Sequence, residues 1–175
     1  MKKLFILLAF LTGFNAHAGF IDIDVNADQL LVGESLEIRL NALDFAEFDY
    51  FDLDFSFDSS VFALDMSSII TDLDPFGFVT SQTATGLAIS FIDFSANSGD
   101  FLLAGFTLTA LAPGHSDFSF EPDGNFYAPG SASPLANINL SAQTSAQVLA
   151  QVPEPAGNAL LLLALTALAL SRRRL

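Results

Sequence analysis

The sequence predicts an all-β fold, a two-sheet antiparallel β-sandwich, for the central part of the chain. Apolar and polar residues alternate with period two along most of residues 19–151. Clusters of turn-forming residues recur about every ten residues, and no amphipathic helical pattern is visible in this region. Most of the 19 phenylalanines fall here as well, so the region can bury a real core and form one domain.

The individual strands follow from this alternation. Near the start of the region, Ile21, Ile23 and Val25 face one way and Asp22 and Asp24 the other. A turn containing Gly33 precedes a strand over 36–41, and the clearest strand covers 51–58, with an aromatic face and a carboxylate face. Further strands are expected at 61–64, 86–94, 101–111 and 117–120, and a final hairpin at 136–140 and 146–149. Residues 95–100 are expected to form a turn and 121–134 a long loop, because its prolines cannot continue a central strand.

The N-terminus has the pattern of a secretory signal peptide over residues 1–18. Lys2 and Lys3 precede an apolar segment of about eleven residues, which is too short for a comfortable membrane span. Small residues at Ala16 and Ala18 form an A-x-A cleavage site before Gly19. The sequence therefore predicts export and a mature chain that begins at Gly19.

The C-terminal residues 152–175 predict a single membrane anchor. Val152, Pro153, Glu154 and Pro155 must be extended, because proline fixes φ and removes a backbone donor. The uncharged run 156–171 is apolar on all faces and would reach about 24 Å as a helix, slightly short of a bilayer core. The cluster of Arg172, Arg173 and Arg174 then places the C-terminus in the cytoplasm. A buried C-terminal helix of a soluble domain is the alternative, although such a helix would rarely be apolar all round.

This tail resembles the PEP-CTERM sorting tail of Gram-negative bacteria. The match consists of the segment 152–155, the apolar run and the arginine cluster, in that order. The resemblance implies recognition by an exosortase, which processes the tail near the Pro-Glu-Pro segment. The protein would then pass from the inner membrane to the cell surface or to an extracellular polysaccharide matrix.

The charge of the region between the two terminal segments limits its partners. All 20 acidic residues lie between Asp22 and Glu154, where Arg39 is the only lysine or arginine, so this interval carries a formal charge of −19. Such a surface excludes nucleic acid and anionic membranes as electrostatic partners. Because the chain has no cysteine, disulfides do not support the domain.

The central region also resembles a cohesin domain. The resemblance lies in the order of four segments, 32–35, 51–62, 86–91 and 102–108, and covers roughly residues 21–120. It implies a jelly-roll-like sandwich of nine strands, in a family that also contains some carbohydrate-binding modules. Dockerin binding is not implied, because no dockerin-contacting motif can be matched residue by residue.

Catalysis is not expected from this sequence. After removal of the signal peptide, His115 is the only histidine, and neither a Gly-x-Ser-x-Gly motif nor a metal-type histidine pair is present. The many carboxylates fall mostly on the solvent faces of strands, which is where a soluble acidic domain needs them. We therefore predict a non-enzyme that requires no cofactor.

Binding of calcium remains open at this stage. Calcium takes six to eight oxygen ligands, and Asp49, Asp52, Asp54 and Asp58 form the main candidate cluster. No cluster has the spacing of an EF-hand loop, so diffuse condensation of cations on the acidic surface is the alternative to a specific site.

Two functions are compatible with these observations. The first is a non-catalytic surface or matrix protein whose sandwich interacts with extracellular polysaccharide or with another protein. The second is a specific carbohydrate-binding module, in which Tyr50, Phe126 and Tyr127 would stack on sugar rings. The absence of tryptophan counts against the second.

Overall fold

The computed structural model describes residues 19–136 and 138–151. The segments assigned from sequence to the signal peptide, 1–18, and to the sorting tail, 152–175, lie outside these residues. Within the described residues all regular structure is β, which confirms the predicted all-β class. A search of the same residues finds no helix with the length and apolar character of a membrane span.

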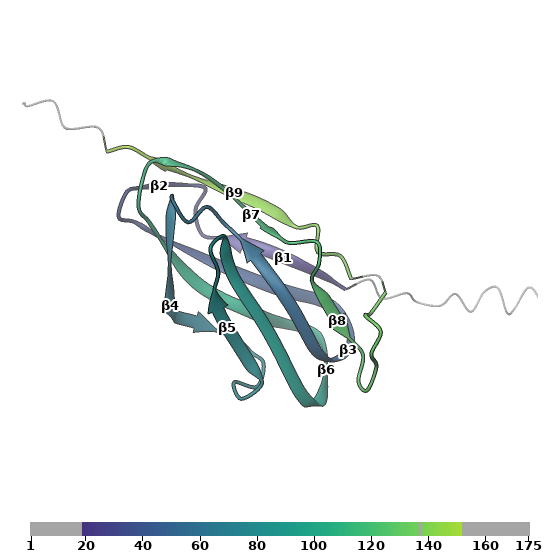
Figure 1. The fold of residues 1–175 in the computed structure, drawn as a ribbon. Coiled ribbons are helices and arrows are strands. Elements are labelled where there is room, and N and C mark those ends of the chain that lie inside the picture. The colour runs from purple at the N-terminus through teal and green to yellow at the C-terminus, as the bar shows by residue number, and fades with distance from the viewer. Residues whose placement is uncertain (1–18, 137, 152–175) are drawn as a thin grey trace, which may run out of the picture.

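Two long strands, β3 (Ser35–Ser56) and β6 (Gly86–Ala110), form the backbone of the fold. They pair antiparallel along almost their whole length, and both bend sharply near their middle (Figure 1). Four register shifts between Leu40 and Tyr50 interrupt the ladder at the bend, where Asp44 has a positive φ of 55°. The Asp100 carboxylate accepts a hydrogen bond from the Asp44 backbone N–H at 2.8 Å and so ties the two bends together.

Because both strands bend, one continuous hydrogen-bonded sheet folds into two layers. The first half of β3 and the second half of β6 form one layer with β1 (Phe20–Val25) and β4 (Phe62–Ile70). The remaining halves form the other layer with β5 (Phe78–Gln82) and β8 (Asn125–Tyr127). On one side of the molecule, β7 (Gly114–Phe120) pairs with the end of β3, then β9 (Gln143–Leu149) with β7 and β2 (Gln29–Leu31) with β9.

The core between the layers is rich in phenylalanine. Phe55 on one half of β3 packs edge-on against Phe106 on the far half of β6, with ring centroids 5.4 Å apart. At the bend, Phe48 contacts five other rings, those of Phe45, Phe51, Phe91, Phe101 and Phe126. The alternation seen in the sequence thus corresponds to the inner face of β1 and of both halves of β3, since burial of apolar surface is the main stabilising term.

The structure corrects several predicted elements. The strands expected at 36–41 and 51–58 are two halves of β3, and the turn expected at 95–100 lies inside β6. The sheet is mixed, because β2 and β9 are parallel, and it is continuous rather than divided in two. The hairpin expected at 136–140 and 146–149 is wrong, since β9 pairs with β7 and β2 instead. The strand β5 was not predicted, and β8 lies within the expected loop 121–134.

The described residues begin and end at opposite ends of the sandwich (Figure 1). Phe20 pairs with Leu43 beside the bend of β3. Gln151 follows β9 at the other end, where its side chain donates a hydrogen bond to the Val32 carbonyl at 3.5 Å. Gln151 therefore lies far from the bend of β3.

Candidate binding face

The outer surface of the layer formed by β8, β3, β6 and β5 is the strongest candidate for a binding site, and we call it the tyrosine face. Alternation along the second half of β3 buries Phe51, Leu53 and Phe55 and turns the residues between them outward. The neighbouring strands follow the same alternation because side chains in register lie on the same side of a pleated sheet. The outward side chains are Tyr50, Asp52, Asp54, Asn125, Tyr127, Ile92, Ser90, Ala88, Val79 and Ser81.

One row across the tyrosine face is apolar and aromatic. Tyr127 of β8 is in register with Tyr50 of β3, which is in register with Ile92 of β6. The two tyrosine rings are in contact, with centroids 5.2 Å apart and planes tilted by 47°. Ile92 is 63% exposed, and Val79, in the adjacent row on β5, is also largely exposed. Exposed apolar side chains that follow one another across a sheet are typical of interaction surfaces.

The next row is polar and acidic. Asp52 lies in register with Asn125 on one side and Ser90 on the other, and Asp54 extends the acidic edge. Burial raises the pKa of the Tyr50 hydroxyl, and the charges of Asp52 and of ionised Tyr127 raise it further. Tyr50 is therefore neutral at physiological pH and presents a hydroxyl group that can both donate and accept hydrogen bonds.

Two phenylalanines project freely at the end of the face nearest the bend. Phe94 follows Ile92 by two residues along β6 and is fully exposed, at 107%. Phe76 lies in the turn that leads into β5 and is nearly as exposed. The backbone N–H of Ile92 donates to the Gly77 carbonyl at 3.1 Å, so this turn is held against β6 close to both rings.

The structure places two of the three candidate stacking residues on the tyrosine face and the third in the core. Tyr50 and Tyr127 are half-buried neighbours on the tyrosine face, as their use in binding would require. The prediction is wrong for Phe126, which is only 1% exposed and packs in the core against Phe45 and Phe51. Alternation along β8 explains this, because Phe126 and Tyr127 must face opposite sides of the strand.

The four candidate calcium ligands are not brought together. Asp52 and Asp54 stand exposed on the tyrosine face. Asp49 accepts a hydrogen bond from the Gly130 backbone N–H at 3.1 Å. Asp58 accepts from the backbone N–H and the hydroxyl of Ser60, which lowers the pKa of its carboxyl. Among the residues that the structure describes, no three histidine or acidic side chains converge as a metal site requires.

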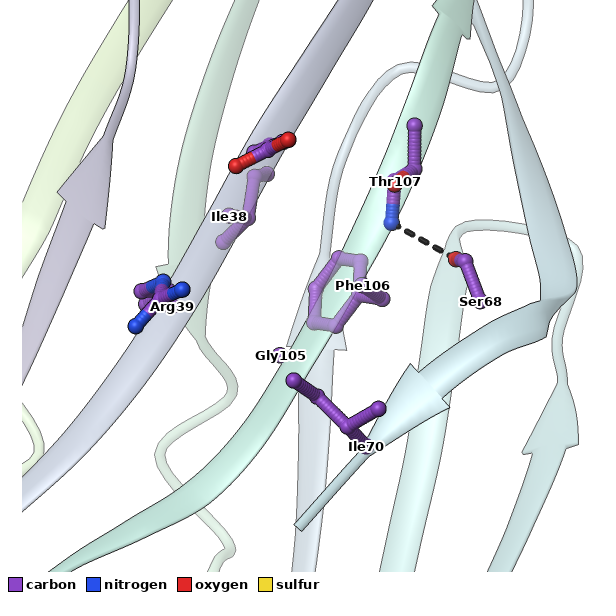
Figure 2. Close-up of a pocket in the computed structure, with 8 residues that line it drawn as sticks. Ile38, Arg39, Ser68, Ile70, Gly105, Phe106 and Thr107 are labelled. Carbon is purple, nitrogen blue, oxygen red and sulfur yellow. Dashed lines mark hydrogen bonds between the residues drawn. The ribbon is translucent and has the colours of Figure 1, made fainter.

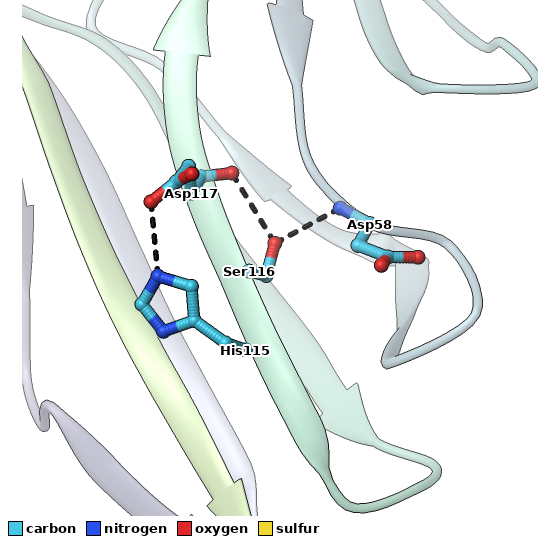
Figure 3. A network of polar contacts seen from close by, with 4 residues as sticks. All are labelled: Asp58, His115, Ser116 and Asp117. Atoms are coloured by element: carbon cyan, nitrogen blue, oxygen red, sulfur yellow. Dashed lines mark hydrogen bonds and ion pairs between the residues drawn. The ribbon is translucent and has the colours of Figure 1, made fainter.

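A serine, a histidine and an aspartate are adjacent on β7, yet they do not form a nucleophilic triad (Figure 3). His115 Nε2 lies 3.0 Å from Asp117 Oδ1, and both side chains are exposed. Ser116 points to the opposite side of the strand and is buried. Its hydroxyl accepts a hydrogen bond from the Asp58 backbone N–H at 2.9 Å and donates to the Asp117 carbonyl at 3.2 Å. The serine therefore stabilises the junction of β3 and β7 and cannot reach the imidazole.

A shallow hollow of about 220 Å³ lies on the outside of the other layer (Figure 2). It forms over Gly105, beside a register shift in β4, where the Ser68 hydroxyl accepts a hydrogen bond from the Thr107 N–H at 2.8 Å. Arg39 borders the hollow, but Asp24 is in register with it on β1 and Glu37 lies two residues away on the same face. The positive charge of Arg39 thus lies among carboxylates on the same face.

Comparison with solved structures places this architecture among the cohesin modules. A cohesin of Acetivibrio cellulolyticus, solved in complex with a dockerin, matches 75% of this chain and 99% of its own, with a TM-score of 0.62 and 12% identity. The cohesin module of a Clostridium perfringens family 33 glycoside hydrolase covers 78% of this chain and 100% of its own, with a TM-score of 0.57 and 15% identity. A non-cellulosomal cohesin of the archaeon Archaeoglobus fulgidus covers 79% of this chain and 96% of its own, with a TM-score of 0.59 and 12% identity.

This chain is similar to cohesins in its fold. No family model matches the sequence, and no curated protein does. The described domain is thus cohesin-like, which confirms the resemblance noted in its sequence, and at 12–15% identity the comparison transfers the architecture alone.

Proposed function

We propose that this chain is a non-catalytic surface protein whose cohesin-like domain binds another protein through the tyrosine face. The observation that carries the proposal is the row of half-buried Tyr127 and Tyr50 and exposed Ile92 on the outer side of a sheet whose inner side packs the core. The outer face of an open sheet suits a protein surface better than a small molecule, because small-molecule sites are typically concave pockets. A cohesin solved in complex with a dockerin supplies a precedent for protein binding by this fold.

The charge of the face defines the chemistry of the partner. Asp52 and Asp54 lie beside the apolar row on the tyrosine face. The outward residues of the tyrosine face include no lysine or arginine. A partner that places an apolar side chain on the tyrosines and surrounds it with basic groups would complement this surface. Binding should consequently weaken as salt is added.

The test compares capture of envelope proteins by three forms of the full chain. A double substitution of Tyr50→Ala and Ile92→Asp removes the apolar row, and Thr107→Ala on the opposite layer serves as the control. The proposal expects a protein that is captured by the wild type and the control, lost with the double variant, and released by salt. Equal capture by all three folded forms would refute the tyrosine face as the site.

The same proposal includes the terminal segments predicted from sequence. A signal peptide that ends at Ala18 and a sorting tail that begins at Val152 would deliver the domain to the surface of a Gram-negative bacterium through an exosortase. The test is the intact mass of the protein from membranes and culture supernatant, in hosts with and without a functional exosortase. A product that ends near Pro155 only when the enzyme is present supports sorting. A single membrane-bound species that retains Arg174 in both hosts contradicts it.

A saccharide ligand is the second candidate, favoured by the contact between Tyr50 and Tyr127 beside Asp49 and Asp52. Stacking on tyrosine and hydrogen bonds to carboxylates are common means of sugar recognition. The chain has two tyrosines and no tryptophan, so its intrinsic fluorescence reports on this face alone. Titration with host polysaccharide, with and without calcium, should change that fluorescence if the second candidate is correct. No change at saturating polysaccharide would leave protein binding as the function.

A further inference from the structure

The edge strand β5 differs from the other edges of the sheet because nothing protects it. It pairs with β6 on one side and makes no other hydrogen bond in the described part of the chain. Its sequence, Phe-Val-Thr-Ser-Gln, lies in a run of eighteen uncharged residues, 75–92, within a strongly acidic chain. Native proteins usually block a free edge with charges, prolines, bulges or very short strands, since its unpaired backbone groups can otherwise extend the sheet.

The remaining edges in the described residues all carry such protection. The strand β1 exposes Asp22 and Asp24, and β4 contains Asp65 together with a register shift. The strands β2 and β8 have three residues each, and Tyr127 of β8 is bridged by Pro134. The open edge of β5 is therefore a specific feature of one side of the sandwich.

An apolar groove lies directly beside this edge. It has a volume of about 420 Å³ and runs between β5 and the second half of β4. Its lining includes Met66, Ile69, Ile70, Leu73 and Phe78, of which Ile70 is more than half exposed. A strand that paired with β5 would cover the groove as well as the exposed Val79, so backbone pairing and apolar burial would act together.

We propose that the occupant of this edge is β5 of a second copy of this chain, in an antiparallel two-fold pair. The strand is self-complementary in that arrangement. Thr80 lies opposite Thr80 of the second copy, Val79 opposite Ser81, and Phe78 opposite Gln82, so that no charged side chain faces another across the junction. Inner residues also meet inner residues, which continues both faces of the layer and the groove across the dimer.

The electrostatics give this dimer a distinctive salt dependence. Each copy carries a large negative charge, and its uncharged edge is where another acidic body can approach most closely. Added salt screens the repulsion between the remaining carboxylates and should strengthen self-association. The basic partner of the tyrosine face should respond in the opposite way, so the two proposals can succeed or fail independently.

Disulfide trapping in the full chain tests the pairing, because the chain contains no cysteine of its own. Residues directly opposite in an antiparallel pair have Cα atoms about 4.5–5.5 Å apart, within the range that a disulfide bridges. A Thr80→Cys variant should therefore form a disulfide-linked dimer under mild oxidation. Gln82→Cys is the matched control on the same strand, since its counterpart in the second copy would lie about 13 Å away along the strand.

We expect roughly tenfold more dimer from Thr80→Cys than from Gln82→Cys, because only the first pair meets the geometry of a disulfide. Adding Val79→Asp to Thr80→Cys should abolish trapping, whereas adding Val79→Thr should not, with folding monitored by circular dichroism. Light scattering of the unmodified chain at rising salt provides a measurement that needs no substitution and should show more dimer. Equal trapping at both positions, trapping that survives Val79→Asp, or a mass that remains monomeric or falls with salt would overturn the proposal.

Discussion

Replacing Phe48 with alanine tests whether the ring cluster at the bend holds the two layers together. Phe48 is fully buried, and its ring lies 5.3–6.3 Å from the five rings around it. Truncation of a buried phenylalanine typically costs about 3–5 kcal/mol. We expect the upper part of that range, because the register shifts on both sides of Phe48 leave the backbone little freedom to close the cavity.

The magnitude can be read as a shift in melting temperature. At about 3–5 °C per kcal/mol for a domain of this size, the Phe48→Ala variant should melt roughly 12–25 °C below the wild type. It should still fold, since domains are generally stable by about 5–15 kcal/mol. Urea unfolding followed by tyrosine fluorescence should show a lower midpoint with an unchanged slope.

Phe94→Ala is the matched control, because it removes the same side chain from the same region but from a fully exposed position. Its free energy of unfolding should change by no more than about 0.5 kcal/mol. If the two variants lose similar stability, or if Phe48→Ala melts with the wild type, the proposed role of the ring cluster is wrong.

Three further predictions concern the titration of Tyr50, the stability of the fold at acidic pH and the close packing of Gly86. Tyrosinate absorbance should show that Tyr50 ionises above the ordinary pKa of 10.0, and Asp52→Asn should lower the pKa of Tyr50 towards that value. A Tyr50 titration at the ordinary pKa would contradict the packing of the tyrosine face. Because its folded pKa is raised, Tyr50 stabilises the fold below pH 10 and loses this contribution as pH rises through the folded pKa. The Ser67 hydroxyl holds the pKa of Asp65 below 3.8 in the folded protein. The contribution of Asp65 to the stability of the fold is therefore present above pH 3.8 and is lost as pH falls through the lower, folded pKa. Asp65→Asn should flatten the dependence of stability on pH in this acidic range, and an unchanged dependence would argue against the hydrogen bond. Gly86→Ala would drive its Cβ into the backbone carbonyl oxygen of Phe55, so a marked loss of thermal stability is expected, and an unaltered melting curve would refute that contact.

Part of the candidate binding face could be predicted from the sequence, and part of it could not. Tyr50 and Tyr127 were identified as candidates for stacking on sugar rings, and the structure places their rings in contact. Phe126 was assigned to the same group because residues 125–127 were expected to lie in a loop, so the alternation that turns Phe126 inward on β8 could not be applied. Ile92 was not singled out, although its position opposite Tyr50 makes it part of the same row.

The sequence by itself determined the local properties of this protein. Period-two alternation identified which side chains of β1 and of the second half of β3 face inward, since adjacent side chains in a strand point to opposite sides. Composition alone determined the acidic, cysteine-free character of the domain. These properties depend on neighbouring residues or on counts, so no knowledge of the tertiary structure was needed.

Only the tertiary structure decided how the strands are joined and paired. Asp44 and Gly99 have positive φ values, which occur in turns and in bulges alike, so the sequence could not show that β3 and β6 bend and continue. The parallel pairing of β2 with β9 joins residues more than a hundred positions apart, and β5 becomes a strand through its ladder with β6. Such pairing depends on contacts that period-two patterns do not encode, and it is this pairing that places Tyr127, Tyr50 and Ile92 in one row and leaves β5 at an open edge.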